Sequence, residues 1–192
     1  MKRLKNVLVY IFIVTSFFIC STLAFYKFFC EKVVVVGTSM YPTLHEGELG
    51  VMIKKTFPIK FKRNDIIIFK KAESNVNVVK RIIGLPGEKI QIDVDGNVLI
   101  NDQEIDQPYL QESEKINTYR SDYIQNMTLT LSNNEYYVMG DHRLVSLDSR
   151  IEGPIKEEYI LAKLIFTYAQ YNNFDSSTHQ GDSQTYFPLR FF

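Results

Sequence analysis

Residues 88–102 have the sequence EKIQIDVDGNVLIND, in which two short apolar runs flank Asp95-Gly96. An Asp-Gly pair between such runs favours a type I′ turn, because that turn needs positive φ at both central residues. The pattern therefore predicts a β-hairpin over residues 90–100.

On both sides of this hairpin, runs rich in Val, Ile, Tyr and Phe are separated by Gly, Pro, Asn and Asp, a pattern typical of strands. The predicted strands span 32–37 (KVVVVG), 65–69 (DIIIF), 77–84 (NVVKRIIG) and 134–141 (NEYYVMGD). Pro154, followed by IKEEYILAKLIF, predicts one short helix near Lys156 to Tyr159 before a last strand. These patterns predict a mainly β domain.

Two segments are less regular. Residues 103–134 are polar and mixed, which predicts long loops or an irregular insertion. Residues 172–192 begin polar and end in a hydrophobic cluster. They predict a poorly ordered tail in which Phe187, Phe191 and Phe192 either pack back or touch lipid.

The N-terminal segment predicts a membrane anchor. Residues 6–26, NVLVYIFIVTSFFICSTLAFY, form a run of 21 residues without a charge. At about 1.5 Å per residue, a helix of this length crosses a hydrocarbon core of roughly 30 Å. A removed signal peptide is the alternative, but its apolar core is shorter and small residues follow it.

The charges that flank this run predict the orientation of the chain. Lys2, Arg3 and Lys5 precede it, so the positive-inside rule places the N-terminus in the cytoplasm. We therefore expect four segments along the chain. They are a cytoplasmic N-terminus (1–5), a transmembrane anchor (6–28), an extracytoplasmic β domain (31–171) and a C-terminal tail (172–192).

Composition narrows the possible partners. The chain has 192 residues, 45% of them hydrophobic, which is enough for one well-packed domain. All 22 acidic residues lie at or after Glu31, and four of the 22 basic residues precede it, which leaves 18 basic against 22 acidic residues in the ectodomain. This balance argues against a nucleic-acid partner.

Cys20 and Cys30 are the only cysteines, so the remainder of the chain folds without disulfides. Ile19 before Cys20 argues against lipidation there.

The segment VGTSMYPTL at 36–44 places Ser39 in a turn after a run of valines. A hydroxyl at a strand end suits a nucleophile, although serine is also common in ordinary turns. The G-x-S-x-G elbow of α/β-hydrolases is only half matched, since Tyr41 replaces the second glycine, and Pro42 occupies the lysine position of an S-x-x-K motif. His45, His142 and His179 offer no motif for a triad.

Lys80 is the remaining candidate base. It lies in the run VVKRII at 78–83, where β alternation places Lys80 and Arg81 on opposite faces. A buried lysine has a lowered pKa and can accept a proton near neutral pH. The plainer alternative is that Lys80 extends from a strand edge into solvent.

A third segment, MGDHRLVSLDSR at 139–150, concentrates polar groups beside a predicted strand. Such density is typical either of a solvated loop or of a buried hydrogen-bonded network that fixes a nearby site. Neither His45-Glu46 nor Asp141-His142 has the spacing of a metal-ligand pair, so we expect no metal.

Taken in order behind an anchor, these segments resemble the bacterial type I signal peptidases, and the short form resembles those of Gram-positive bacteria. The resemblance covers the chain from the anchor to about Tyr171. The matching boxes are SMYPTL (39–44), KRNDIIIF (62–69), VVKRIIGLPGE (78–88) and GDHRLVSLDSR (140–150).

The resemblance implies an antiparallel β-sheet catalytic domain with a Ser-Lys dyad, and it implies a role for each matched residue. Ser39 is implied as the nucleophile and Lys80 as the general base. The implied supporting roles are orientation of the lysine by Ser146, bracing of the site by Asp148 and Arg150, structural roles for Arg81 and Asp141, and a lipid or substrate contact by Met40.

Three positions depart from the family pattern. His142 replaces an asparagine and Asn64 replaces a glycine, so local turns can differ. Gly37 stands where some members have a serine that helps to form the oxyanion hole, which leaves more of that task to the amide of Ser39.

The resemblance implies cleavage of exported preproteins after small residues of the Ala-x-Ala type, without a cofactor, by a monomer in the cell membrane. Two alternatives remain open. A non-catalytic relative could serve as a chaperone for pilus or surface-fibre assembly, but there the catalytic residues are typically replaced. A self-cleaving Ser-Lys repressor shares the core fold but carries a DNA-binding domain in place of the membrane span.

Overall fold

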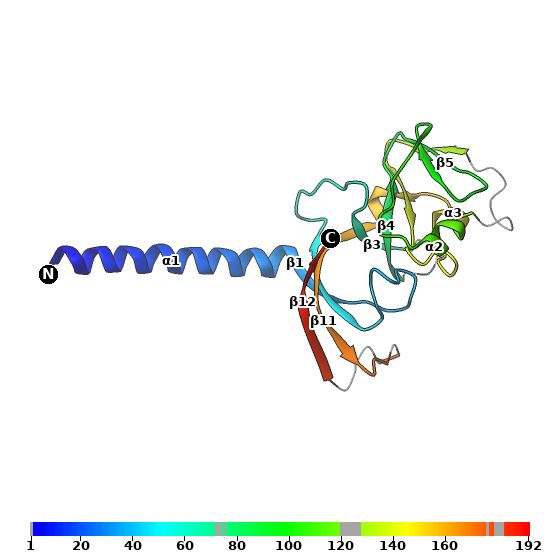
Figure 1. Ribbon diagram of the computed structural model, residues 1–192. Coiled ribbons are helices and arrows are strands. Elements are labelled where there is room, and N and C mark those ends of the chain that lie inside the picture. The colour runs from blue at the N-terminus through cyan, green and yellow to red at the C-terminus, as the bar shows by residue number, and fades with distance from the viewer. Residues whose placement is uncertain (1, 72–73, 75, 120–127, 176, 179–182) are drawn as a thin grey trace.

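The computed structural model describes residues 2–71, 74, 76–119, 128–175, 177–178 and 183–192. One long helix, α1 (Lys2–Phe29), projects from a β domain (Figure 1). The part of α1 from Arg3 to Phe29, 27 residues, is long enough and apolar enough overall to cross a membrane. The helix contacts the β domain at its end, where the rings of Phe25 and Phe29 pack on Phe57.

The main sheet has eight strands, and every pair in it is antiparallel. Its order is β1-β2-β11-β3-β4-β9-β10, and β12 also pairs with β11. The strands are β1 (Cys30–Val34), β2 (Glu48–Lys54), β3 (Ile66–Lys70), β4 (Asn77–Gly84), β9 (Glu135–Met139), β10 (Ile155–Lys156), β11 (Ile160–Asn172) and β12 (Ser183–Phe191). The long strand β11 pairs with β2, β3 and β12, so it connects the C-terminal strand to β2 and β3.

A smaller antiparallel sheet has the order β7-β6-β5-β8. Its strands are β5 (Lys89–Ile92), β6 (Val98–Ile100), β7 (Gln103–Glu104) and β8 (Thr128–Thr130). The pairing of β5 with β6 confirms the predicted hairpin, but the turn prediction was wrong. Gly96 has a φ of 86° whereas Asp95 has no positive φ, because the Asp93 carboxylate binds the Asp95 and Asn97 amides and shapes a longer loop.

The predicted strands at 65–69, 77–84 and 134–141 correspond to β3, β4 and β9. The predicted helix near Lys156 to Tyr159 is a single 3₁₀ turn, η1 (Glu157–Tyr159). Two short helices were not predicted, α2 (Glu112–Ile116) and α3 (Ser149–Glu152). The segment 103–134 is therefore more regular than predicted, since it holds β7, α2 and β8, while its residues 120–127 lie outside the described part of the chain.

Two further predictions need correction. The first strand spans Cys30–Val34 rather than 32–37, because the chain leaves the ladder and turns at Gly37, whose φ is 81°. The tail was predicted to be poorly ordered, but β12 pairs with β11 from residue 183 to 191. Phe192 packs on the core, Phe191 is 69% exposed, and the side chain of Phe187 lies outside the described part of the structure.

Buried apolar side chains form three clusters rather than the single core expected from length. One joins the small sheet to β9, and another lies between β3, β9 and β11. The third contains Val35, Met40, Leu44, Ile66, Ile68, Ala162 and Leu164. This third cluster supports the segment between β1 and β2, which carries Ser39.

Candidate active site

Ser39 lies in the turn that follows β1. The turn is closed by the Tyr41 amide, which donates to the Thr38 carbonyl at 3.0 Å, and by the Leu44 amide, which donates to the Met40 carbonyl at 2.9 Å. Leu44 is fully buried and fixes the turn on the core, while Ser39 remains half-buried. A serine hydroxyl is thereby held at the surface by a rigid support.

Lys80 reaches Ser39 from β4, and its Nζ donates a hydrogen bond to Ser39 Oγ at 2.6 Å. Its side chain is only 3% exposed. Burial lowers the pKa of Lys80 to about 8, although the negative charges of Asp148 and Glu152 act in the opposite direction. An amine with this pKa is partly neutral at physiological pH, so it can accept the serine proton.

A groove of about 510 Å³ runs up to Ser39. Its walls come from β1 and the segment that continues it, from β2 and β3, and from the start of β4, and most of the lining residues are apolar. The lining residues are Val33, Val34, Val35, Val36, Gly37, Ser39, Met40, Met52, Ile68, Val76, Asn77, Val78 and Val79. The pairing of β4 with β9 starts only at Arg81, so residues 77–80 have no β9 partner along that edge.

Met40 and Gly37 both line the groove. Met40 is 2% exposed and packs in the third core cluster, and its role as a lipid or substrate contact stays a prediction. Gly37 has a φ of 81°, a conformation that strains any side chain. Its amide donates to the Glu46 carboxylate at 3.1 Å.

Arg81, the neighbour of Lys80, makes a different set of contacts. Its guanidinium donates to both carboxylate oxygens of Asp141, at 2.9 and 2.6 Å. Asp141 also accepts from Thr43 Oγ1 at 2.5 Å, and the Tyr109 ring covers the guanidinium at 3.9 Å. This buried network joins β4 to the turn that carries Ser39, which agrees with the structural roles expected for Arg81 and Asp141.

Asp148 and Arg150 form a second buried network. Arg150 donates from Nε and Nη2 to the two carboxylate oxygens of Asp148, at 2.8 and 2.9 Å, and Asp148 also accepts from the Gly140 amide at 2.9 Å. Burial alone would raise the pKa of Asp148, but the hydrogen bonds and charge of Arg150 hold that pKa below its usual value. These contacts lie in the loop that follows β9, and the bracing role expected for both residues stays a prediction.

Ser146 is buried in the same region, and within the described part of the chain its hydroxyl has no hydrogen-bond partner. The described Lys80 amine bonds Ser39 and makes no hydrogen bond to Ser146, so orientation of the lysine by Ser146 stays a prediction. In space, Gly140 lies between Ser146 and the turn that carries Ser39. A Cβ at this position would lie 2.3 Å from Ser146 Oγ and 2.5 Å from the Ser39 carbonyl oxygen, so a side chain there would displace the nucleophile turn.

Several contacts to the site were missed by the sequence reasoning. The His142 amide donates to the Ser39 carbonyl at 3.1 Å, so this departure from the family pattern touches the nucleophile turn. Arg143 is fully buried and donates to the Gly140 carbonyl at 3.0 Å. Asn64 has a φ of 70°, which asparagine tolerates, and its carbonyl accepts from Arg81. Only the density of polar residues at 139–150 signalled such a network.

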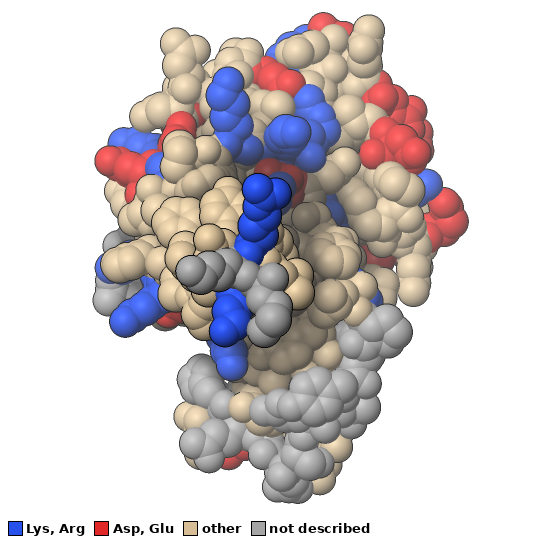
Figure 2. Space-filling model, turned by 90° about the vertical axis from the view of Figure 1, so that its left-hand side faces the viewer, with Lys and Arg blue, Asp and Glu red and all other residues tan. Residues whose placement is uncertain are grey.

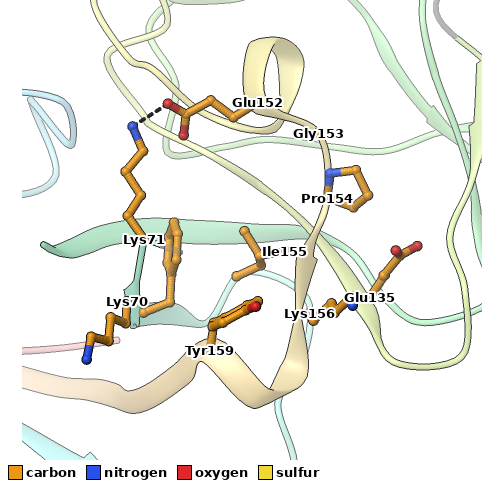
Figure 3. A pocket seen from close by; sticks show the side chains of 10 residues that line it. Lys70, Lys71, Glu135, Glu152, Gly153, Pro154, Ile155, Lys156 and Tyr159 are labelled. Carbon is orange, nitrogen blue, oxygen red and sulfur yellow. Dashed lines mark ion pairs between the residues drawn. The ribbon is translucent and has the colours of Figure 1, made fainter. Parts of the chain in front are cut away.

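A second hollow, of about 310 Å³, lies beside β10 and the end of α3 (Figure 3). None of the predicted site residues lines it. Lys71 and Glu152 form an ion pair at its rim, and their charges act in opposite directions on the pKa of Lys80. No group of three His, Cys, Asp or Glu side chains able to hold a metal was found in the described ranges.

Comparison with known proteins identifies the family of this chain. A family model described as signal peptidase, peptidase S26 matches residues 4–169. Signal peptidase I T of Bacillus subtilis (strain 168) is 37% identical over 153 residues, which cover 76% of this chain and 77% of that protein. Signal peptidase I of Bacillus licheniformis is 40% identical over 131 residues, covering 64% of this chain and 67% of the relative.

Signal peptidase I of Streptococcus pneumoniae (strain ATCC BAA-255 / R6) is 34% identical over 173 residues, which cover 73% of this chain and 83% of that protein. A crystal structure of a signal peptidase I from Enterococcus faecalis V583 has 32% identity and a TM-score of 0.47, covering 55% of this chain and 97% of that one.

The family match and the β domain define a peptidase. More particularly, the chain belongs to the peptidase S26 family of signal peptidases. This membership and the apolar helix α1 together indicate association with a membrane.

Proposed function

We propose that this protein is a membrane-anchored serine endopeptidase that removes signal peptides from exported preproteins, with Ser39 as nucleophile and Lys80 as general base. The observation that carries the proposal is the 2.6 Å hydrogen bond between the Lys80 amine and the Ser39 hydroxyl. Family membership supports signal-peptide cleavage. The lowered pKa of Lys80 supports its assignment as the base.

The apolar groove receives the segment before the cleavage site. An extended peptide can pair with the free edge of residues 77–80, as in β-strand addition, and its side chains then alternate between the groove and solvent. Because the walls are valine and methionine side chains close to the nucleophile, small apolar residues fit beside the scissile bond. This geometry supports cleavage after Ala-x-Ala-like sequences.

In the reaction, neutral Lys80 removes the proton of Ser39 Oγ, and the oxygen attacks the scissile carbonyl. The protonated amine then gives that proton to the leaving amine of the mature protein, which leaves an ester between Ser39 and the signal peptide. A water molecule deprotonated by the same lysine hydrolyses the ester and restores the serine. Each proton that Lys80 accepts is returned, so the cycle needs no cofactor.

The amide of Ser39 is the candidate donor to the developing oxyanion. The Gly37 amide is already bonded to Glu46, so it is not available for this role. Removal of one such donor from a peptidase costs on the order of 10²-fold in rate, which makes the position of the Ser39 turn critical.

The proposed location is the extracytoplasmic face of the cell membrane, with residues 1–5 in the cytoplasm and residues 6–28 spanning the bilayer. Figure 2 shows the molecule from the side of the N-terminal end of α1, with several Lys and Arg side chains near the centre of the view. The groove then lies where exported chains emerge.

The test is cleavage of a preprotein by the full-length protein in detergent micelles. We expect the wild type to release a mature chain whose new N-terminus follows a small residue, and we expect Ser39→Ala and Lys80→Ala each to abolish release. Exposed Lys70, at the end of β3, provides the control Lys70→Ala, which should retain activity. Wild-type inactivity against several preproteins, with normal folding, would favour the chaperone alternative.

A further inference from the structure

The C-terminal strand β12 reaches the turn that carries Ser39. Arg190, near the end of β12, pairs with Thr167 of β11 and extends its guanidinium toward the segment between β1 and β2. We call residues 38–48 of that segment the nucleophile loop. Arg190 lies 147 positions beyond the loop residue that it contacts, so the contact joins distant parts of the chain.

Arg190 makes two hydrogen-bonding contacts with the nucleophile loop. Its Nη1 donates to the Thr43 carbonyl at 3.2 Å, and its Nη2 pairs with the carboxylate of Glu48. Glu48 is 2% exposed and also binds His45 Nδ1 at 3.0 Å. A carboxylate buried to this degree needs a cationic partner, so the loop depends on Arg190 for its charge balance.

Thr43 connects this contact to the dyad. Its carbonyl is held by Arg190, and its hydroxyl is held by Asp141, which in turn pairs with Arg81 beside Lys80. The loop is therefore fixed from two sides, from β4 and from the C-terminal strand. A loss on either side would release the turn in which Ser39 meets Lys80.

Phe192 adds an apolar contact of the same kind. It follows β12 and packs against the cluster that contains Val35 together with Met40 and Leu44 of the nucleophile loop. Its ring lies 6.0 Å from the Arg190 guanidinium, and its amide donates to the Ile165 carbonyl at 2.9 Å. The family model ends at residue 169, so these contacts lie beyond the region that it matches.

From these contacts we infer that the C-terminal strand is a positioning clamp, in which Arg190, assisted by Phe192, holds the nucleophile loop so that Ser39 stays within hydrogen-bonding distance of Lys80. The inference rests on the proposed function of Ser39 and Lys80. Arg190 acts through Thr43 and Glu48 and does not touch the reacting atoms. Its effect should therefore fall on the rate of the chemical step and not on binding in the groove.

The first test compares Arg190→Ala, Arg190→Lys and the neighbouring control Leu189→Ala, whose side chain is 53% exposed, in the full-length protein. We expect Arg190→Ala to lower kcat roughly 10- to 100-fold with little change in KM, because small displacements of reacting groups have effects of this size. Arg190→Lys should recover part of the rate, because lysine keeps the positive charge but lacks the planar guanidinium that contacts both Thr43 and Glu48. Unchanged kcat in Arg190→Ala would overturn the clamp.

The second test does not depend on activity. Hydrogen–deuterium exchange in the full-length chain should be faster for the peptide covering residues 38–48 in Arg190→Ala, and unchanged in Leu189→Ala. Unchanged exchange in Arg190→Ala would refute the clamp even if the wild type cleaves no preprotein. If exchange and kcat change only in proportion to a loss of folded protein, measured by circular dichroism, Arg190 is merely structural and the inference fails.

Discussion

Replacement of Lys80 by methionine should abolish cleavage and yet stabilise the fold. Methionine has a similar length and no charge, so Lys80→Met keeps the packing of β4 while it removes the amine that burial disfavours. The structure places this amine in a site where its side chain is 3% exposed. Stability is thus expected to rise at the position where activity is lost.

The size of the effect follows from the pKa of Lys80, which burial lowers from 10.5 to about 8. A difference of this size corresponds to about 3 kcal/mol of unfavourable free energy for carrying the charged amine into the folded state. Loss of the hydrogen bond to Ser39 offsets about 1 kcal/mol of the gain. We therefore expect Lys80→Met to be more stable than the wild type by about 2 kcal/mol at pH 7.

The pH dependence has a definite sign. Because the pKa of Lys80 is lower in the folded state, the penalty is fully present below about pH 8 and disappears as pH rises toward 10.5. The advantage of Lys80→Met should therefore shrink to near zero by about pH 10.

Urea unfolding of the full-length protein in micelles, followed by tyrosine fluorescence, would measure this difference, since the chain has 12 tyrosines and no tryptophan. The control Lys70→Met, at an exposed position of the adjacent strand, should change stability by no more than about 0.5 kcal/mol. A clear destabilisation by Lys80→Met at pH 7, or an advantage that does not fade at high pH, would refute the assignment of a desolvated amine.

Two further predictions concern the same site. Cleavage by the wild type at subsaturating substrate should rise about tenfold between pH 7 and pH 9, because the neutral fraction of Lys80 grows from about 9% to about 91%. A flat pH profile would contradict its role as base. Gly140→Ala should reduce kcat by about 100-fold, because the new methyl group would lie 2.5 Å from the Ser39 carbonyl oxygen. Circular dichroism should show that this variant is still folded. A near-normal kcat would show that the turn can move without cost.

Much of the β architecture could be predicted because it depends on local pattern. The runs at 65–69 and 77–84 contain consecutive β-branched residues between polar boundaries, and they form β3 and β4. β2 was missed, since its segment ELGVMIK includes Gly50, and glycine is depleted in strands. Glycine is favoured at position 50, because a Cβ there would lie only 2.9 Å from the side chain of Leu164 on β11. Only the fold reveals that close approach.

The tail could not be predicted for a related reason. The segment 183–191 contains Pro188, and a proline argues against a strand. The pairing of this segment also depends on β11, whose own position is set by β2 and β3. The meeting of Ser39 and Lys80 was predicted because the order of motifs carried that information. The contacts of Arg190 belong to no motif, so only the three-dimensional arrangement brings them to the nucleophile loop.

The arrangement of charges explains how the Lys80 amine keeps a lowered pKa although the carboxylates of Asp148 and Glu152 act to raise it. A carboxylate bonded directly to Lys80 would favour its charged form and raise its pKa. The carboxylate of Asp148 is instead engaged by Arg150 through Nε and Nη2, and that of Glu152 pairs with Lys71. The charges of Arg150 and Lys71 lower the pKa of Lys80, while those of Asp148 and Glu152 raise it. The two cations thus offset the two acids, which leaves burial as the dominant influence on the amine.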